Sequence, residues 1–128
     1  SGPVRSENGF EQITKNTSTG AITTDAVYNA TIRGGVQTLT GAGAVDLTNL
    51  VTELTTTGAD ALTLADGTTS GQVKIINMIV DGGDGTLTPT TFANGTTITF
   101  DAVAESATLV WNSTIGWVAT SVQGATIA

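Results

Sequence analysis

The strongest constraint on the fold is the regular alternation of short β-type runs with turn residues from position 36 to the C-terminus. Runs of Val, Ile, Leu, Thr and Phe are separated by Gly and Asp, at the spacing of about 8–12 residues that is typical of sandwiches and barrels. Thr is the commonest residue, and its β-branched side chain suits a pleated surface better than a helix. The sequence therefore predicts an all-β protein, a small antiparallel, jelly-roll-like sandwich or barrel.

Strand positions follow from the same alternation. The longest apolar run, residues 73–80, predicts a central strand covered on both faces, and the Asp81-Gly-Gly-Asp-Gly85 turn ends it sharply. The Asn94-Gly95 pair predicts a hairpin, and a second hairpin carries Trp111 and Trp117. Strands are expected at residues 36–40, 44–47, 51–55, 61–64, 72–80, 87–88, 96–100, 107–111 and 116–120.

The chain divides into an arm, residues 1–35, and one β-domain, residues 36–128. The arm mixes polar residues with isolated apolar ones and has no sustained period of 2 or 3.6, which predicts an extended segment that orders against a partner. Disorder is the alternative. Residues 25–33 are denser in apolar side chains and predict a strand or one short helix, and Gly34-Gly35 marks the boundary.

A weak internal echo relates residues 39–48 to residues 54–63, because an apolar residue followed by Thr recurs in both. Two copies fall short of the three or so stacked units that a solenoid requires. Shared strand and turn chemistry explains the echo at least as well as a structural repeat does.

Charge and residue types narrow the function classes. The net charge of −7 opposes the neutralisation of phosphates, so nucleic acid is not an expected partner. The sequence contains no Cys and no His, which removes disulfides, thiolate nucleophiles, the usual zinc sites and the commonest general base. No apolar run approaches the ~18–20 residues of a membrane span, and the N-terminus lacks a signal-peptide pattern. We expect no enzyme activity, no cofactor and no membrane partner.

Carboxylates are the remaining candidates for chemistry. A pair held about 5–9.5 Å apart would suit a glycosidase, but most of these acids sit beside Gly, Ala or Thr, so solvated turn residues are the favoured interpretation. For residues 81–85 a plain turn is favoured over a calcium loop, since the alternating ligands and terminal Glu of an EF-hand are missing. The acids are Asp46, Glu53, Asp60, Asp66, Asp81, Asp84, Asp101 and Glu105.

The chain has little bulky material to bury, since only 39% of its residues are hydrophobic and 5% are aromatic. Small domains bury a modest share of their surface, and shared interfaces can supply what is missing, so an oligomer is expected. The two tryptophans fit a core or subunit contact better than an exposed platform for a sugar ring. The candidates for the core or a subunit contact are Leu62, Leu64, Ile76, Met78, Ile98, Phe100, Leu109, Trp111 and Trp117.

The C-terminal part of the chain contains short motifs at residues 63–67, 71–76, 81–89, 95–100, 107–111 and 116–118. Their order resembles a β-domain of tailed-bacteriophage virion proteins, particularly those of marine phages. Such domains occur in head decoration (cement) proteins and in fibres. The order of the motifs is more specific than any one of them.

The resemblance implies a jelly-roll-like trimer at three-fold sites on the outer capsid surface of the virion, with an arm that reaches the major capsid protein. A receptor-binding or tail-fibre domain for host attachment is the alternative, and a depolymerase a more remote one. An arm, one domain and no coiled-coil heptads favour the capsid. Under this hypothesis the capsid-contact candidates are Val4, Arg5, Phe10, Ile13, Lys15, Ile22, Val27, Tyr28, Ile32 and Arg33.

Overall fold

The structure is a computed structural model, and it describes residues 5–6, 10–11, 14–15, 18–20, 22–23 and 33–128. The chain forms two units, Ser1–Ile32 and Arg33–Ala128. The described residues contain strands and turns but no helix, so the prediction of an all-β protein is confirmed for them. Val51 N donates a 3.1 Å hydrogen bond to Gly35 O, so Gly35 belongs with the second unit.

The first unit contains short antiparallel strand pairs that the sequence does not predict. Each strand has two residues, too few for an alternating pattern to be visible in the sequence. The strand or short helix expected at residues 25–33 lies outside the described residues, apart from Arg33. The pairs are β1 (Arg5–Ser6) with β2 (Phe10–Glu11), and β3 (Thr14–Lys15) with β4 (Ile22–Thr23).

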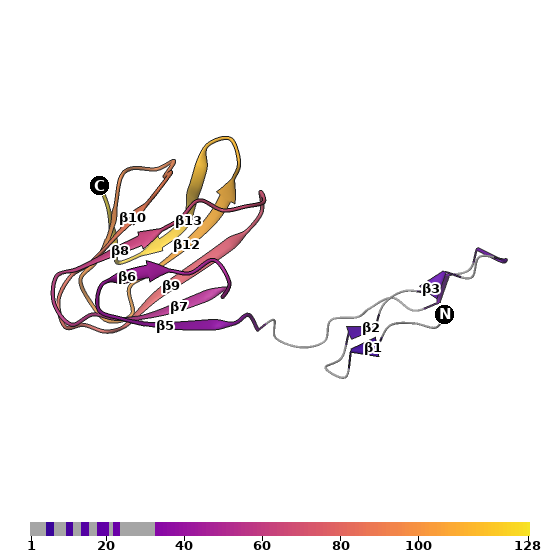
Figure 1. The fold of residues 1–128 in the computed structure, drawn as a ribbon, viewed down its shortest axis with the longest axis horizontal. Helices are drawn as coiled ribbons and strands as arrows, with labels where there is room; N and C mark the ends of the chain where they lie inside the picture. The colour runs from indigo at the N-terminus through magenta and orange to yellow at the C-terminus, as the bar shows by residue number, and fades with distance from the viewer. Residues whose placement is uncertain (1–4, 7–9, 12–13, 16–17, 21, 24–32) are drawn as a thin grey trace. The chain divides into compact units, whose positions relative to one another are not determined.

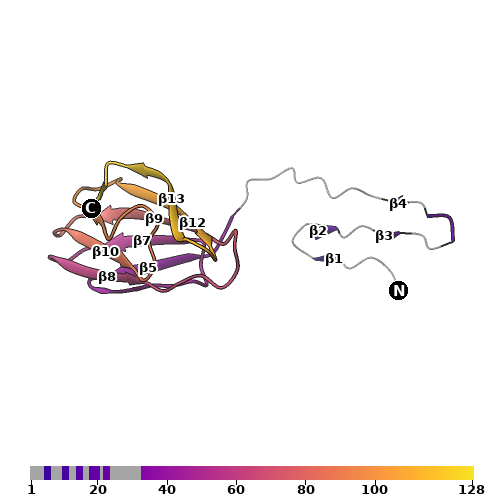
Figure 2. The ribbon, with the colours of Figure 1, turned by 90° about the horizontal axis from the view of Figure 1, so that it is seen from above.

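The second unit consists of two five-stranded sheets, shown from two directions in Figures 1 and 2. The first sheet has the order β13 (Gly116–Gln123), β12 (Ser106–Asn112), β9 (Val73–Val80), β7 (Val51–Thr55), β5 (Val36–Thr40). The second sheet has the order β14 (Thr126–Ile127), β11 (Ile98–Phe100), β10 (Gly85–Pro89), β8 (Asp60–Leu64), β6 (Gly43–Val45). The two sheets are separate, so the unit is sandwich-like and not a closed barrel.

From β5 to β10 the chain passes alternately from one sheet to the other and builds three stacked coils. Strands β5, β7 and β9 are parallel neighbours in the first sheet, and β6, β8 and β10 are parallel neighbours in the second. Hydrogen bonds between coils continue around the corners, from Gly41 N to Thr55 O (2.9 Å) and from Thr56 N to Val80 O (3.0 Å). The positive φ of Gly41 (72°) allows the tight corner between β5 and β6.

The stacked coils explain the first part of the internal echo, the match between Leu39 and Leu54. Leu39 pairs in register with Leu54, which pairs with Met78. The second part is not a structural repeat, because Leu62 pairs with Gly43 and not with Leu47. The third coil is hidden in the sequence because a longer connection, residues 65–72, separates β8 from β9.

The expectation of antiparallel sheets is wrong, because both sheets are mixed. The later strands are antiparallel: β11 pairs with β10 and β14, and β12 pairs with β9 and β13. The strands from β5 to β10 are parallel within each sheet because the short corners after β5 and β7 lead into the opposite sheet. The chain therefore returns to each sheet in the same direction, which a hairpin between neighbours cannot do.

Most predicted strands lie where the sequence places them, and the differences have local causes. Strand β6 ends at Val45 because Asp46 begins a turn in which its Oδ1 accepts a hydrogen bond from Asn49 N (2.9 Å). Strand β11 begins at Ile98, since the N–H groups of Thr96 and Thr97 bond to Ala128 O. The two-residue β14 is not predicted.

The predicted turns are present, with one difference in length. The Asp81 turn ends β9, and Asp81 Oδ1 accepts a 3.0 Å hydrogen bond from Gly83 N, whose φ is 143°. The tryptophan hairpin forms as expected, with Trp111 opposite Trp117. Asn94-Gly95 lies in the connection of residues 90–97 between β10 and β11, so that hairpin is antiparallel but not tight.

The core lies between the two sheets. Side chains alternate along each strand, so every second residue points inward and is buried. All nine residues that the sequence offers for the core or a subunit contact are buried there. The remaining buried hydrophobic residues are Val45, Leu54, Leu87 and Ala107.

Shortening Leu54 is expected to test the stacked coils. Leu54 is fully buried between Leu39 and Met78, so Leu54→Ala should lower the free energy of unfolding by about 2–5 kcal/mol, the range for such cavities. Thr88→Ala on the exposed side of β10 is the control and should change it by less than about 1 kcal/mol. Urea unfolding followed by tryptophan fluorescence measures both, and equal effects would contradict the packing.

Candidate functional site

The predicted capsid contacts fall in the part of the chain that is least described. Arg33 is exposed at the start of the second unit. Val4, Ile13, Val27, Tyr28 and Ile32 lie outside the described residues. Arg5, Phe10, Lys15 and Ile22 lie in the two-residue strands, and only their backbone is described. Their role in binding a capsid stays a prediction.

Trp111 and Trp117 belong to the core. Trp117 is fully buried, Trp111 is 8% exposed, and their rings meet edge to face with centroids 5.4 Å apart. Trp117 Nε1 donates a 2.9 Å hydrogen bond to Ala65 O, which satisfies the indole within the protein. The two rings therefore do not form an exposed platform for a sugar.

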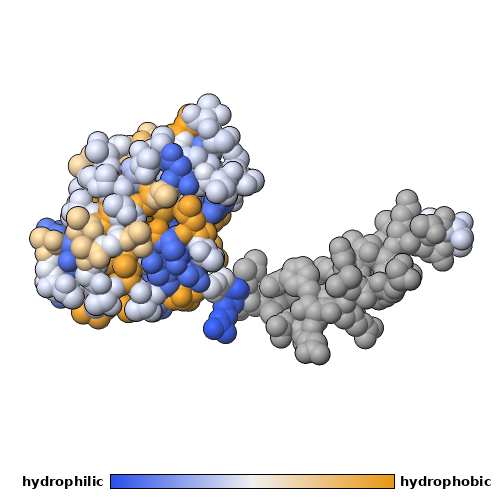
Figure 3. Space-filling model, in the orientation of Figure 1, coloured by the Kyte–Doolittle hydropathy of each residue, from blue (hydrophilic) through white to orange (hydrophobic). Residues whose placement is uncertain are grey.

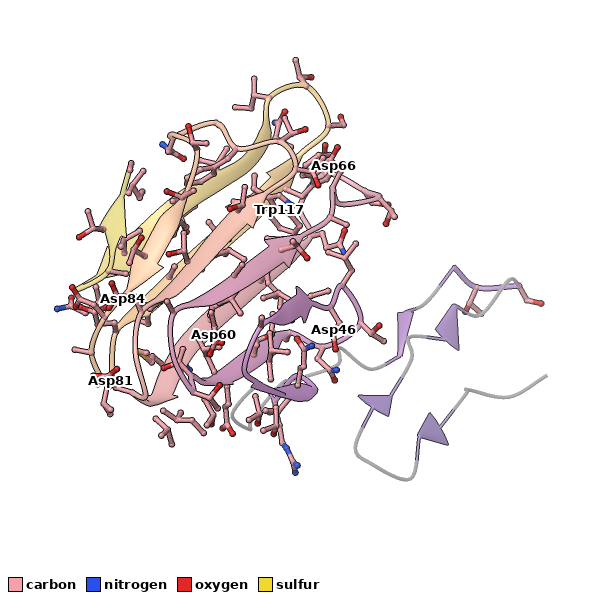
Figure 4. The ribbon with its side chains drawn as sticks, turned by 60° about the vertical axis from the view of Figure 1, so that its left-hand side comes forward. Asp46, Asp60, Asp66, Asp81, Asp84 and Trp117 are labelled. Carbon is pink, nitrogen blue, oxygen red and sulfur yellow. The ribbon has the colours of Figure 1, made fainter. Side chains whose placement is uncertain are left out.

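The acids of the domain lie mainly at turns and are separated along it. Asp81 and Asp84 lie at one end, and Asp66 lies at the other, near Trp117 (Figure 4). Asp60 Oδ2 accepts a 2.8 Å hydrogen bond from Thr57 N, and Asp66 Oδ2 accepts one of 3.2 Å from Thr91 Oγ1. Among the described residues, no group of three or more His, Cys, Asp or Glu side chains could hold a metal ion.

A buried lysine is the feature that the sequence interpretation missed. Lys74 interrupts the apolar run of β9 and points into the core, where its side chain is 2% exposed. Its Nζ donates to Asn49 O at 2.8 Å and to Asp46 Oδ1 at 3.3 Å. The signal in the sequence was the single charge at an inward position of an otherwise apolar strand.

The environment shifts the pKa values of both charged groups downward. Burial lowers the pKa of Lys74, and the neighbouring Asp46 carboxylate only partly opposes this effect. Burial alone would raise the pKa of Asp46, but hydrogen bonds from Asn49 and Lys74, together with the lysine charge, lower it overall. The lowered pKa of Asp46 favours its carboxylate form beside Lys74.

Gln37 extends this lysine network to the first coil. Its Oε1 accepts hydrogen bonds from Asp46 N (2.9 Å) and from Thr52 Oγ1 (2.7 Å), and its Nε2 donates to Ala44 O (2.9 Å). Every buried side-chain nitrogen and oxygen in the described residues has a hydrogen-bond partner. The lysine network thus joins all three coils, and its role is structural.

The two sheets differ in the residues that they turn outward. Small side chains cover the outer face of the second sheet, and none of them is a large apolar residue. They are Ala44, Ala61, Thr63, Thr86, Thr88, Thr99 and Thr126. Figure 3, which shows one side of the molecule, has many residues of near-neutral hydropathy, with hydrophobic and strongly hydrophilic ones interspersed.

Six β-branched apolar residues lie in two rows on the outer face of the first sheet, and we call these two rows the valine face; Ile79 and Val80, at the end of β9, are exposed as well. The first row of the valine face crosses three strands in register, and so does its second row. The first row is Val36, Val51 and Ile75, and the second row is Val73, Val110 and Val118. Val36 is 48% exposed and Val73 37%, and the other four are half-buried by their neighbours.

Polar, mostly uncharged residues border the valine face. Thr38, Glu53 and Asn77 follow the first row on β5, β7 and β9, and Glu53 is the one ionisable residue at the outward positions of these strands. Six adjacent Val and Ile side chains on a nearly neutral sheet face form a surface suited to contact with protein.

No protein-family model matches the chain, and no curated protein matches it significantly. In the part of the chain that the structure describes, no helix is long and apolar enough to cross a membrane. The surfaces described above are therefore the basis for the function proposed below.

Removing one partner of the Lys74–Asp46 pair should lower the free energy of unfolding more than replacing both partners. Asp46→Ala leaves a buried ammonium unpaired and should lower the free energy of unfolding at pH 7 by about 3 kcal/mol, the low end of the range for broken buried pairs, because Asp46 is itself 31% exposed. The double variant Asp46→Ala/Lys74→Met, measured by the same urea unfolding, should be more stable than the single one. A double variant as unstable as Asp46→Ala would contradict this account.

The advantage of the natural protein over Asp46→Ala should depend on pH. Because the pKa of Asp46 is lowered on folding, its stabilising contribution is complete above the ordinary Asp value of about 3.9 and is lost as pH falls through the lower folded value. Urea midpoints of the two proteins should therefore converge at the acid end of a titration. A constant difference down to that end would contradict the assigned pKa direction.

Proposed function

We propose that this protein is a virion structural protein, a trimeric capsid decoration (cement) protein of a tailed bacteriophage. It binds the outer surface of the head at three-fold sites and stabilises the shell. The observation that carries the proposal is the valine face, an apolar outer surface on an acidic domain whose described aromatic side chains are used in its own core. Such a surface serves association between proteins better than it serves chemistry on a small substrate.

The proposed mechanism is thermodynamic. A protein that binds the assembled shell in preference to its dissociated subunits stabilises the shell by mass action at many equivalent sites. Three copies held together bind at a high effective concentration, so the trimer binds the shell more tightly than one copy would. No turnover, cofactor or nucleic acid is involved in this mechanism.

The finer features of the proposal are a jelly-roll-like trimer and an extended N-terminal arm, for which the sequence predicts residues 1–35 and of which residues 33–35 belong with the second unit. The arm residues Arg5 and Lys15, with Arg33, meet acidic patches of the major capsid protein. Its apolar residues, among them Phe10 and Ile22, anchor the arm in grooves between capsid subunits. The alternative of host attachment by a tail fibre has lost its most direct support, because Trp111 and Trp117 are buried.

Removal of residues 1–33 should separate the two roles of the chain. The truncated protein should keep the oligomeric state of the full chain, but it should add to expanded empty heads at least about tenfold more weakly, since multivalent anchoring is lost. Cosedimentation with heads measures addition, and the temperature at which heads disrupt measures stabilisation.

The control is the full chain carrying Thr88→Ala, which alters an exposed residue of the second sheet and should behave like the natural protein. Full-length protein that fails to add to heads, or to raise their disruption temperature, would contradict the proposed function. Truncated protein that binds as tightly as the full chain would contradict the role of the arm only.

A further inference from the structure

The contrast between the two outer faces points to a surface that is covered in the working protein. Both sheets have five strands and the same inward alternation, yet one turns only Ala and Thr outward, whereas the other turns a group of Val and Ile side chains outward among its polar ones. In a chain where Thr is the commonest residue, chance alone favours Thr at exposed strand positions. The valine face therefore departs from what solvent exposure favours.

Strand β9 supports the same conclusion. The sequence predicts that β9 is covered on both faces, and within the described residues this prediction is wrong for the outer face. Within the described chain, one face of β9 is buried by the second sheet, and Val73 and Ile75 on the other face stay accessible. A partner against the outer face would complete the burial that the sequence of β9 anticipates.

The charge distribution makes a second copy of this chain a suitable partner at this face. Residues 33–128 hold eight acidic and two basic residues, and one of the basic residues, Lys74, is buried against Asp46. The exterior is therefore acidic, and identical copies repel each other at most orientations. On the strands that carry the first row of the valine face, Glu53 is the single outward charge, so copies can meet there with little repulsion.

We infer that the valine face is the surface through which identical copies associate, with three copies turning this face toward a common axis. The number three rests on the proposed function, whereas the surface rests on the structure. A closed ring of three needs two different patches that touch each other. The two rows offer them, because the first row lies on β5, β7 and β9, and the second lies on β9, β12 and β13.

The experiment compares matched charge substitutions on the two outer faces. Val51→Asp places a carboxylate in the first row, and Thr86→Asp places one at a half-buried outward position of the second sheet. Light scattering after size-exclusion chromatography should give a trimer for the natural protein and for Thr86→Asp, and a folded monomer for Val51→Asp. Fluorescence of the buried Trp117 reports whether each variant is folded.

A milder variant keeps the test decisive if Val51→Asp fails to fold. Val51→Thr retains a β-branched shape that the chain uses at many strand positions. It should raise the concentration at which the trimer dissociates by about tenfold or more, since one apolar group is lost at each of three contacts. An unchanged dissociation concentration overturns the inference.

Three other results also overturn it: a natural protein that is monomeric or dimeric, a Val51→Asp variant that stays trimeric, and equal loss of the trimer in both Asp variants. Addition to heads is measured separately. If Val51→Asp remains a trimer but no longer adds to heads, the face contacts the capsid, and the inference fails while the proposed function stands. If the valine face controls the trimer but the trimer ignores heads, the proposed function fails and the inference stands.

Discussion

The structure depends on the in-register stacking of apolar side chains between successive coils. Leu39, Leu54 and Met78 form one such column along the first sheet, and Val45 and Leu64 pair in the second. Each coil alone is too thin to bury these residues, so the coils are stable only together, as in repeat proteins. The antiparallel strands β11 to β14 then extend both sheets on the side away from β5 and β6. A chain with few aromatic side chains can thus form a continuous core by repeating aliphatic ones in columns.

Strand positions could be predicted from the sequence because they depend on neighbouring residues. Alternation of apolar and polar residues, closed by Gly and Asp, located β5, β7 and β9 within a residue or so. Which strands pair, and in which direction, depends on where each corner leads. The corner at Gly41 carries the chain into the opposite sheet, and nothing local distinguishes it from a hairpin. The antiparallel prediction failed for this reason, and the third coil was missed because its spacing differs.

The valine face could not be predicted from the sequence, because strand pairing is not determined by neighbouring residues. Core residues such as Leu62 and Phe100 follow from alternation along one strand. The valine face needs the register of five strands, because Val36, Val51 and Val118 are distant in sequence and become neighbours only through pairing. The sequence predicts that both faces of β9 are covered, but in the structure only the inner face is covered. The difference between prediction and structure draws attention to the outer face.

The lysine network has a consequence for the accuracy of folding. Strands rich in Val and Ile can slide along one another by two residues and still present a similar apolar face, so hydrophobicity alone discriminates poorly between alignments. In β9 such a slip would move the ammonium of Lys74 to the place of Ile76 and separate it from the Asp46 carboxylate. An unpaired charge in hydrocarbon costs several kcal/mol. One internal cation therefore penalises shifted alignments of an otherwise ambiguous strand and favours a single native arrangement.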